Sequence, residues 1–251
     1  MAEFINDLKD RDLVRYMLLR SIKDENQRKH IATLLEFDSE ISRIPFLIND
    51  GMMGYIRTAW WRDNLLNGNI HISYTENTLL YRAQGLVQYN RNNAETVKAF
   101  TDLISSIELI IERRKFDYPE EFIEAYIDPV GTAYAILICS ILRIPVDEHI
   151  VTLFRSYAII AFVRSYDLLV DFGWEIFDLP HPKLITLLNK SLNNIKKLDK
   201  QVLKHKPFRV IYTATEFFAD YYLKNIPSKE ASLYEPNLGL LKMKLAWQIL
   251  F

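Results

Sequence analysis

The 251-residue chain has little cysteine and little glycine, and each shortage excludes a class of protein. A single cysteine, Cys139, excludes an intramolecular disulfide and any cysteine-rich zinc site. Because Cys139 lies in the apolar run 135–142, we expect it to be a small core residue. Glycine accounts for only 7 residues, where about 7% of a chain is usual. Few glycines and few turn clusters favour long helices over many short strands.

An excess of positive charge is also missing, as is a long apolar run. The formal net charge is -1, so no bulk positive field attracts nucleic acid, and we predict no nucleic-acid partner. Residues 1–15 alternate acids and bases and lack the apolar core of a signal peptide. The longest apolar run, 130–142, is shorter than the roughly 20 residues that span a bilayer. These features predict a cytoplasmic protein and leave contact with a membrane surface open.

Apolar residues recur at intervals of three and four along three long segments, which is the pattern of amphipathic helices. The three faces are Ile31, Leu34, Leu35 and Ile41, with the charged Asp38 on the same side; Val97, Phe100, Ile104, Ile107 and Ile111; and Leu184, Leu188, Leu192, Ile195, Leu198 and Val202. Proline, glycine and asparagine predict breaks near 45–54, 67–78, 115–119, 143–145, 179–182, 206–207 and 226–236. No strand-like alternation competes and no linker is visible. We therefore predict an all-α fold with a single domain over residues 1–251.

Segment 153–172 differs from the others because it is apolar on nearly every side. Such a helix is normally enclosed by its neighbours. Arg164, Asp167 and Asp171 nevertheless share one stripe of it, at i, i+3 and i+7. Burying three ionised groups is costly unless they pair, bind a metal or line a wet cavity. We therefore expect this stripe to face an internal cavity.

The Asp167 and Asp171 carboxylates have a spacing that suits Mg²⁺ chemistry. An Asp-x-x-x-Asp pair lies on one helix face about one turn apart and can hold this hard cation. Bound Mg²⁺ can hold a diphosphate and help it leave, while an apolar pocket shields a carbocation from water. The alternative is a salt bridge between Arg164 and Asp167 near the end of the helix.

Several segments resemble the squalene/phytoene synthase family over nearly the whole chain. Residues 28–63 are similar to the opening of these proteins, and the most specific part is GYIRTAWWRD at 54–63. Tyr126 and the Val-Gly-Thr step at 130–132 resemble a second family helix, and 162–180 resembles a third block. The resemblance implies an isoprenoid (terpenoid) synthase type of fold, a single large helical bundle with a central cavity.

The resemblance also implies an activity, a Mg²⁺-dependent prenyltransferase that joins two prenyl diphosphates head to head. By this likeness, Asp167 and Asp171 would hold Mg²⁺ and act in catalysis. Arg164 and Arg28 would bind the diphosphate, and Tyr126 would line the pocket.

The first Asp-rich motif of the family is not kept here. Its aspartates would fall near Ser42, Arg43 and Phe46, none of which is acidic. A cation at Arg43 would repel Mg²⁺. Asp38 lies about one turn upstream on the inward face. Together with Glu40, it would have to replace the missing aspartates at a different height in the cavity.

The second motif has two registers. Aligned on Arg164, its aspartates fall on Ser165 and Leu169 and the motif is lost; aligned on Leu179 and Pro180, they fall on Asp167 and Asp171. The shared stripe of Arg164, Asp167 and Asp171 favours the second register.

This pattern is similar to one branch of the family, which includes the mitochondrial assembly factor for respiratory complex I, regarded as a non-catalytic descendant. Two functions are therefore open. One is the prenyltransferase. The other is a non-catalytic protein on the same fold that binds an isoprenoid or another lipid, or assembles with a protein partner.

Overall fold

In the computed structural model every regular element is helical within the residues that the structure describes, which are 2–47, 51–66, 78–89, 93–112, 115–171, 176–177, 180–226 and 238–250. The predicted all-α class is confirmed. The elements are α1 (Ala2–Arg11), α2 (Leu13–Ser21), α3 (Glu25–Ser42), α4 (Ile44–Leu47), α5 (Gly51–Leu66), α6 (Thr78–Tyr89), α7 (Ala94–Glu112), α8 (Pro119–Phe122), η1 (Ile123–Ile127), α9 (Asp128–Leu142), α10 (Glu148–Asp171), α11 (Pro180–Lys196), η2 (Val202–Lys204), α12 (Lys206–Asn225) and α13 (Gly239–Leu250).

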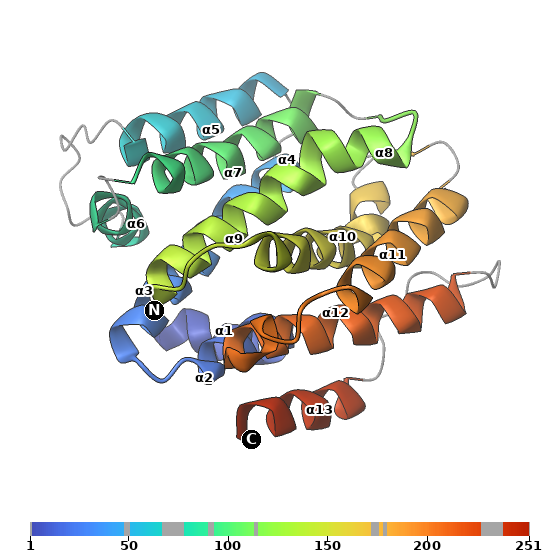
Figure 1. The fold of residues 1–251 in the computed structure, drawn as a ribbon. Helices are drawn as coiled ribbons and strands as arrows, with labels where there is room; N and C mark the ends of the chain where they lie inside the picture. The colour runs from blue at the N-terminus through green and yellow to red at the C-terminus, as the bar shows by residue number, and fades with distance from the viewer. Residues whose placement is uncertain are drawn as a thin grey trace.

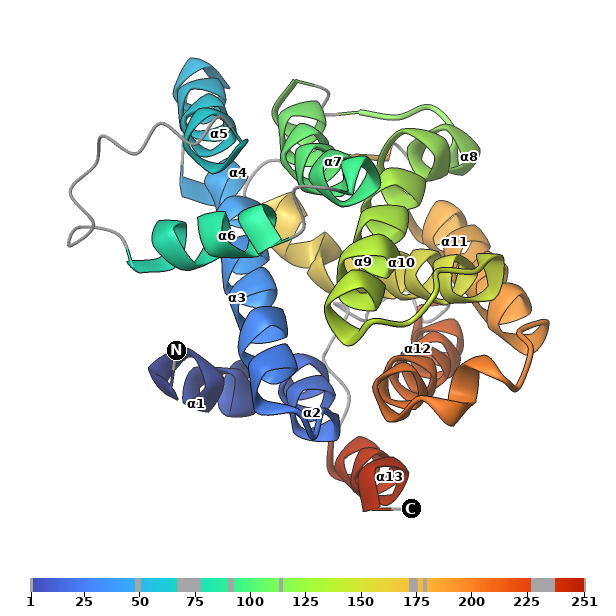
Figure 2. The ribbon, with the colours of Figure 1, turned by 60° about the vertical axis from the view of Figure 1, so that its left-hand side comes forward.

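Helices α9 and α10 occupy the middle of the structure, with α5 and α7 on one side and α12 and α13 on the other (Figures 1 and 2). Helix α9 packs against α7 and α10, and α10 also packs against α11 and α12. Helix α5 lies outside α7, and α2 reaches across to α12. Helix α10 is therefore packed between neighbours over most of its length, as its apolar sequence predicted, but Leu168 and Val170 near its C-terminal end are exposed.

The predicted apolar faces form the core, with one correction. On α3 the residues from Ile31 to Ile41 that share the predicted face are buried, and so is Asp38. The third face does not continue as one helix, because α11 ends at Lys196 and Val202 lies in the short 3₁₀ turn η2. The predicted breaks at 67–78 and 226–236 fall largely outside the described residues.

Helix α9 continues backwards through a π turn into α8, so that residues 119–142 form one helical stretch. Pro129 has no N–H to bond the carbonyl four residues earlier, and its ring clashes with that carbonyl, which accounts for the widened turn. This stretch exceeds the predicted apolar run and is long and apolar enough to cross a membrane by length and composition. Its α9 part packs against α3, α7 and α10, as a core helix does, so length alone assigns no span.

Gly131 lets α9 and α10 approach closely. A Cβ atom at this position would lie 2.5 Å from the Cα atom of Arg155 and 2.6 Å from its backbone nitrogen. The Arg155 Nε donates to the Thr132 hydroxyl across the same contact, at 3.1 Å. The Val-Gly-Thr step that the family resemblance singled out therefore has a packing role here.

Candidate functional site

A pocket of about 570 Å³ lies between α2, α3, α7, α9 and α10. This volume is in the usual range for sites that bind small molecules. Its wall is mostly apolar and includes Ile107 and Ile110 of α7, Ile138 of α9, and Ala158, Ala161 and Phe162 of α10. Charged and hydroxyl side chains gather at the end formed by α2 and α3, so the pocket is amphipathic.

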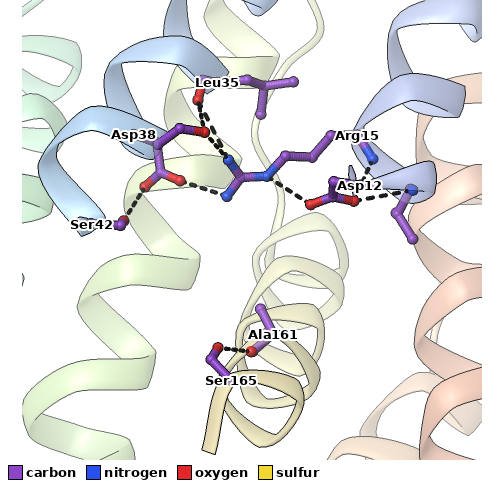
Figure 3. Close-up of polar contacts among 9 residues, drawn as sticks. Asp12, Arg15, Leu35, Asp38, Ser42, Ala161 and Ser165 are labelled. Atoms are coloured by element: carbon purple, nitrogen blue, oxygen red, sulfur yellow. Dashed lines mark hydrogen bonds and ion pairs between the residues drawn. The ribbon is translucent and has the colours of Figure 1, made fainter. Parts of the chain in front are cut away.

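An ion pair between Arg15 and Asp38 occupies this polar end (Figure 3). The Arg15 Nη2 donates to Asp38 Oδ2 at 2.5 Å, and Nη1 donates to the Ser39 hydroxyl at 2.8 Å. The Arg15 Nε lies 3.4 Å from Asp12 Oδ2. All three guanidinium nitrogens therefore have an oxygen partner. Burial opposes the charge on this group, but Asp38 and then Tyr134 and Asp12 outweigh it and raise the pKa of Arg15.

The local sequence explains why these two side chains meet. Asp12 caps α2 by accepting from the backbone N–H groups of Val14 and Arg15, each at 3.1 Å, which fixes where the helix begins. Arg15 then lies one turn before Leu18 and Leu19, which are both buried, so its side chain points inward. Asp38 points to meet it from the buried face of α3.

Three tyrosines, Tyr126, Tyr134 and Tyr157, also line the pocket. Burial, and after it the charge of Asp38, raise the pKa of Tyr126 and of Tyr134. Burial and then Asp12 raise the pKa of Tyr157. All three are therefore neutral at physiological pH and can donate a hydrogen bond. The Tyr134 hydroxyl is buried near the Asp38 carboxylate, whose charge helps to raise its pKa. It nevertheless makes no hydrogen bond of ordinary distance and angle.

The predicted stripe of α10 does not face this pocket. Arg164 is half-buried, with its guanidinium carbon 4.4 Å from the ring centre of Phe218 on α12. Asp167 is half-buried, Asp171 is exposed, and neither lines the pocket. The expectation that these three groups share a cavity is wrong for this pocket. Because α10 has neighbours on several sides, its apolar pattern could not indicate which face borders the pocket.

The pocket side of α10 instead presents Ala161, Ser165 and Leu169. The Ser165 hydroxyl donates to the Ala161 carbonyl within the helix, at 2.5 Å (Figure 3). Ser165 and Leu169 are the positions of the Arg164 register, in which the second acidic motif is lost. Leu179, which defines the other register, lies outside the described residues.

The remaining predicted residues divide into two groups. Asp38 and Tyr126 both line the pocket, as do Ser42 and Arg43, where the resemblance would place the first Asp-rich motif. Arg28 does not, because its Nη1 donates to the backbone carbonyl of Ile22 at 3.3 Å.

The pocket residues do not fit Mg²⁺. This cation prefers several oxygen ligands in an octahedral arrangement. The pocket acids, Asp12 and Asp38, are both engaged by Arg15. Across the described ranges, no three side chains of His, Cys, Asp or Glu gather closely enough to hold a metal. The metal role of Asp167 and Asp171 stays a prediction that this geometry does not support.

Sequence reasoning missed Arg15, Tyr134 and the role of Tyr157. Two signals were present. Arg15 interrupts the inward stripe of α2, and Tyr126, Val130, Tyr134 and Ile138 recur at every fourth residue, which places them on one side of the η1–α9 helix. All four line the pocket.

Compared with known protein families, with curated proteins and with solved structures, the chain gives no match.

Proposed function

We propose that the protein is a non-catalytic binding protein on an isoprenoid synthase type of fold, and that its pocket holds a long apolar lipid such as an isoprenoid. The observation that carries the proposal is the Arg15–Asp38 ion pair. It occupies the polar end of the pocket, where a Mg²⁺-dependent prenyltransferase would need free carboxylates. Family membership, drawn from the segments at 54–63 and 130–132, is part of the proposal.

The mouth of the pocket supports uptake of a lipid. Leu168 lines the pocket and is 49% exposed, and Leu47, next to the lining residue Phe46, is 56% exposed. An apolar rim lets a lipid pass into the pocket without first becoming fully hydrated. We propose that the protein works in the cytoplasm and takes up its lipid at a membrane surface.

Binding of an apolar fluorophore tests the proposal directly. N-phenyl-1-naphthylamine is expected to bind the wild-type protein and to be displaced by farnesol or geranylgeraniol. The Ala161→Phe variant should lose this binding, since the new ring enters the pocket beside Phe162. The matched control is Ala59→Phe, which places the same ring at an exposed position of α5 outside the pocket.

A turnover assay decides between this proposal and the prenyltransferase. Wild-type protein and the Asp167→Ala/Asp171→Ala variant are incubated with farnesyl diphosphate and Mg²⁺. We expect equal, background release of diphosphate from both. Release by the wild type above that of the variant would establish the enzyme and overturn the non-catalytic function.

A contact with a protein partner is a second candidate, supported by the outer face of α5. Met52 is 70% exposed and Ile56 is 55% exposed, and Trp60 lies one turn further on the same face. Exposed apolar residues gathered on one helix face mark contact sites. If an assembly role is correct, Ile56→Glu should remove a partner that co-purifies from the native cell with the wild type. Unchanged recovery would exclude this face.

A further inference from the structure

The cation within the polar end of the pocket, Arg15, is already paired with carboxylates. Arg15 is engaged by Asp38 at 2.5 Å and by Asp12 at 3.4 Å, so little of its positive charge is left for a ligand. The other cations of the pocket, Arg11 and Arg43, are exposed at its edge. An anionic headgroup beside Arg15 would have to displace Asp38 or lie beside a like charge, and both are unfavourable.

The same end of the pocket can form hydrogen bonds with an uncharged ligand. The Tyr134 hydroxyl is buried and lacks a hydrogen bond of ordinary geometry, a condition that buried polar groups seldom keep. Asp38 Oδ1 accepts from the Ser42 hydroxyl only at a long distance, 3.4 Å. A donor and an acceptor are therefore both present, on α9 and α3, at the polar end of a mostly apolar pocket.

We infer that the pocket selects a long apolar molecule ending in a neutral oxygen, an alcohol or a carbonyl, over one ending in a carboxylate or phosphate. The ligand oxygen accepts from the Tyr134 hydroxyl, and an alcohol also donates to Asp38. This inference rests on the proposed function and adds the headgroup to it.

Three probes with one tail test the headgroup: farnesol, farnesyl phosphate and farnesyl diphosphate, the last with and without Mg²⁺. Affinities are measured by displacement of N-phenyl-1-naphthylamine. Farnesol is expected to bind at least about 10-fold more tightly than either phosphate. The Tyr134→Phe variant should lose about 2- to 10-fold in affinity for farnesol relative to its own affinity for the fluorophore, the usual effect of one hydrogen bond. Tyr118→Phe, at an exposed residue outside the pocket, is the matched control.

Asp38→Asn gives an independent test, because it frees Arg15. The affinity for farnesyl phosphate relative to farnesol should then rise at least about 5-fold, as a freed cation strengthens anion binding. If this variant does not fold, the relative affinities of the wild-type protein for the three probes are sufficient to test the inference. Equal or tighter binding of a phosphate by the wild type overturns the inference and leaves the proposed function standing. Failure to bind the fluorophore and all three probes overturns both.

Discussion

Arg15 of α2 and Asp38 of α3 form an ion pair with 2.5 Å between Nη2 and Oδ2 at the polar end of the pocket. Their side chains retain only 23% and 10% of their exposure, so the pair lies mostly away from water. It links two helices and removes the free carboxylate that a metal would need. Under the proposed function, we expect stability and the choice of ligand to depend on this same contact.

Asp38→Asn should destabilise the protein by about 1–3 kcal/mol, because the Arg15 charge then stays partly buried without its counter-charge. Urea unfolding followed by circular dichroism measures the change. Asp102→Asn removes the half-buried partner of the exposed Lys98 on α7 and should alter stability by less than about 0.5 kcal/mol. Equal effects of the two substitutions would show that the Arg15–Asp38 pair behaves as a surface pair.

A double substitution separates the pair from the burial of its charges. Arg15→Met with Asp38→Leu removes both charges and keeps similar volumes. Its cost should be smaller than the sum of the two single costs, since neither charge is left uncompensated. Additive costs in the same unfolding experiment would contradict a direct coupling.

Gly131→Ala should destabilise the protein by about 2–3 kcal/mol or more, because the new methyl group collides with the Arg155 backbone, which cannot rotate away. Gly85→Ala on α6 is the matched control. Nothing lies within 4 Å of a Cβ atom at Gly85, so this change should stabilise the helix by about 0.5–1 kcal/mol. Opposite shifts of the thermal midpoint are expected for the two variants. A neutral Gly131→Ala would show that α9 and α10 are not in contact at this step.

More of the fold than of the candidate site could be predicted from the sequence. Periodicity located the faces of α3 and α7 because an amphipathic helix shows its buried side as a stripe in the sequence. Periodicity did not locate the pocket side of α10, because Arg164, Asp167 and Ser165 all lie on a helix packed between several neighbours. Enclosure tells that a helix is central but not which of its sides borders a pocket.

The polar end of the pocket is formed by residues that are far apart in the sequence. Arg15 and Asp38 are 23 residues apart and meet only because α2 and α3 pack together. Asp38 could be assigned to the inward face from its own helix, whereas its partner could not. The sequence therefore predicted Asp38 but not its partner Arg15, which is identified only by the packing of α2 against α3.

Cys139 should be inert in the native state, because its side chain is fully buried. Burial and then the charge of Asp147 raise the pKa of this thiol to about 12, and the thiolate is the reactive form. Labelling with dithionitrobenzoate at pH 8 should be slow in buffer and complete within minutes in urea. Rapid stoichiometric labelling of the native protein would contradict this.

The raised pKa of the Cys139 thiol should also make the stability of the protein depend on pH. Because Cys139 holds its proton more tightly when folded, the unfolded state loses its proton first as the pH rises above about 8.5. Stability therefore falls between that pH and about 12, by up to about 1.4 kcal/mol per pH unit. Urea unfolding of the wild type and of Cys139→Ala at pH 7.5 and pH 10 isolates this effect. The wild type should lose more stability than the variant, and parallel losses would refute the buried thiol as the cause.

Tyr134→Phe should stabilise the ligand-free protein by about 1 kcal/mol, although it weakens ligand binding. The buried hydroxyl has lost its water and gains no ordinary hydrogen bond in return, so its removal relieves a desolvation penalty. Thermal unfolding without ligand measures the gain, and Tyr118→Phe, at an exposed hydroxyl, should shift stability by less than about 0.5 kcal/mol. A loss of 1 kcal/mol or more would mean that the hydroxyl makes a strong native hydrogen bond, with Asp38 as its acceptor. In that case the Tyr134–Asp38 contact closes the polar end, and no donor is left there for a ligand.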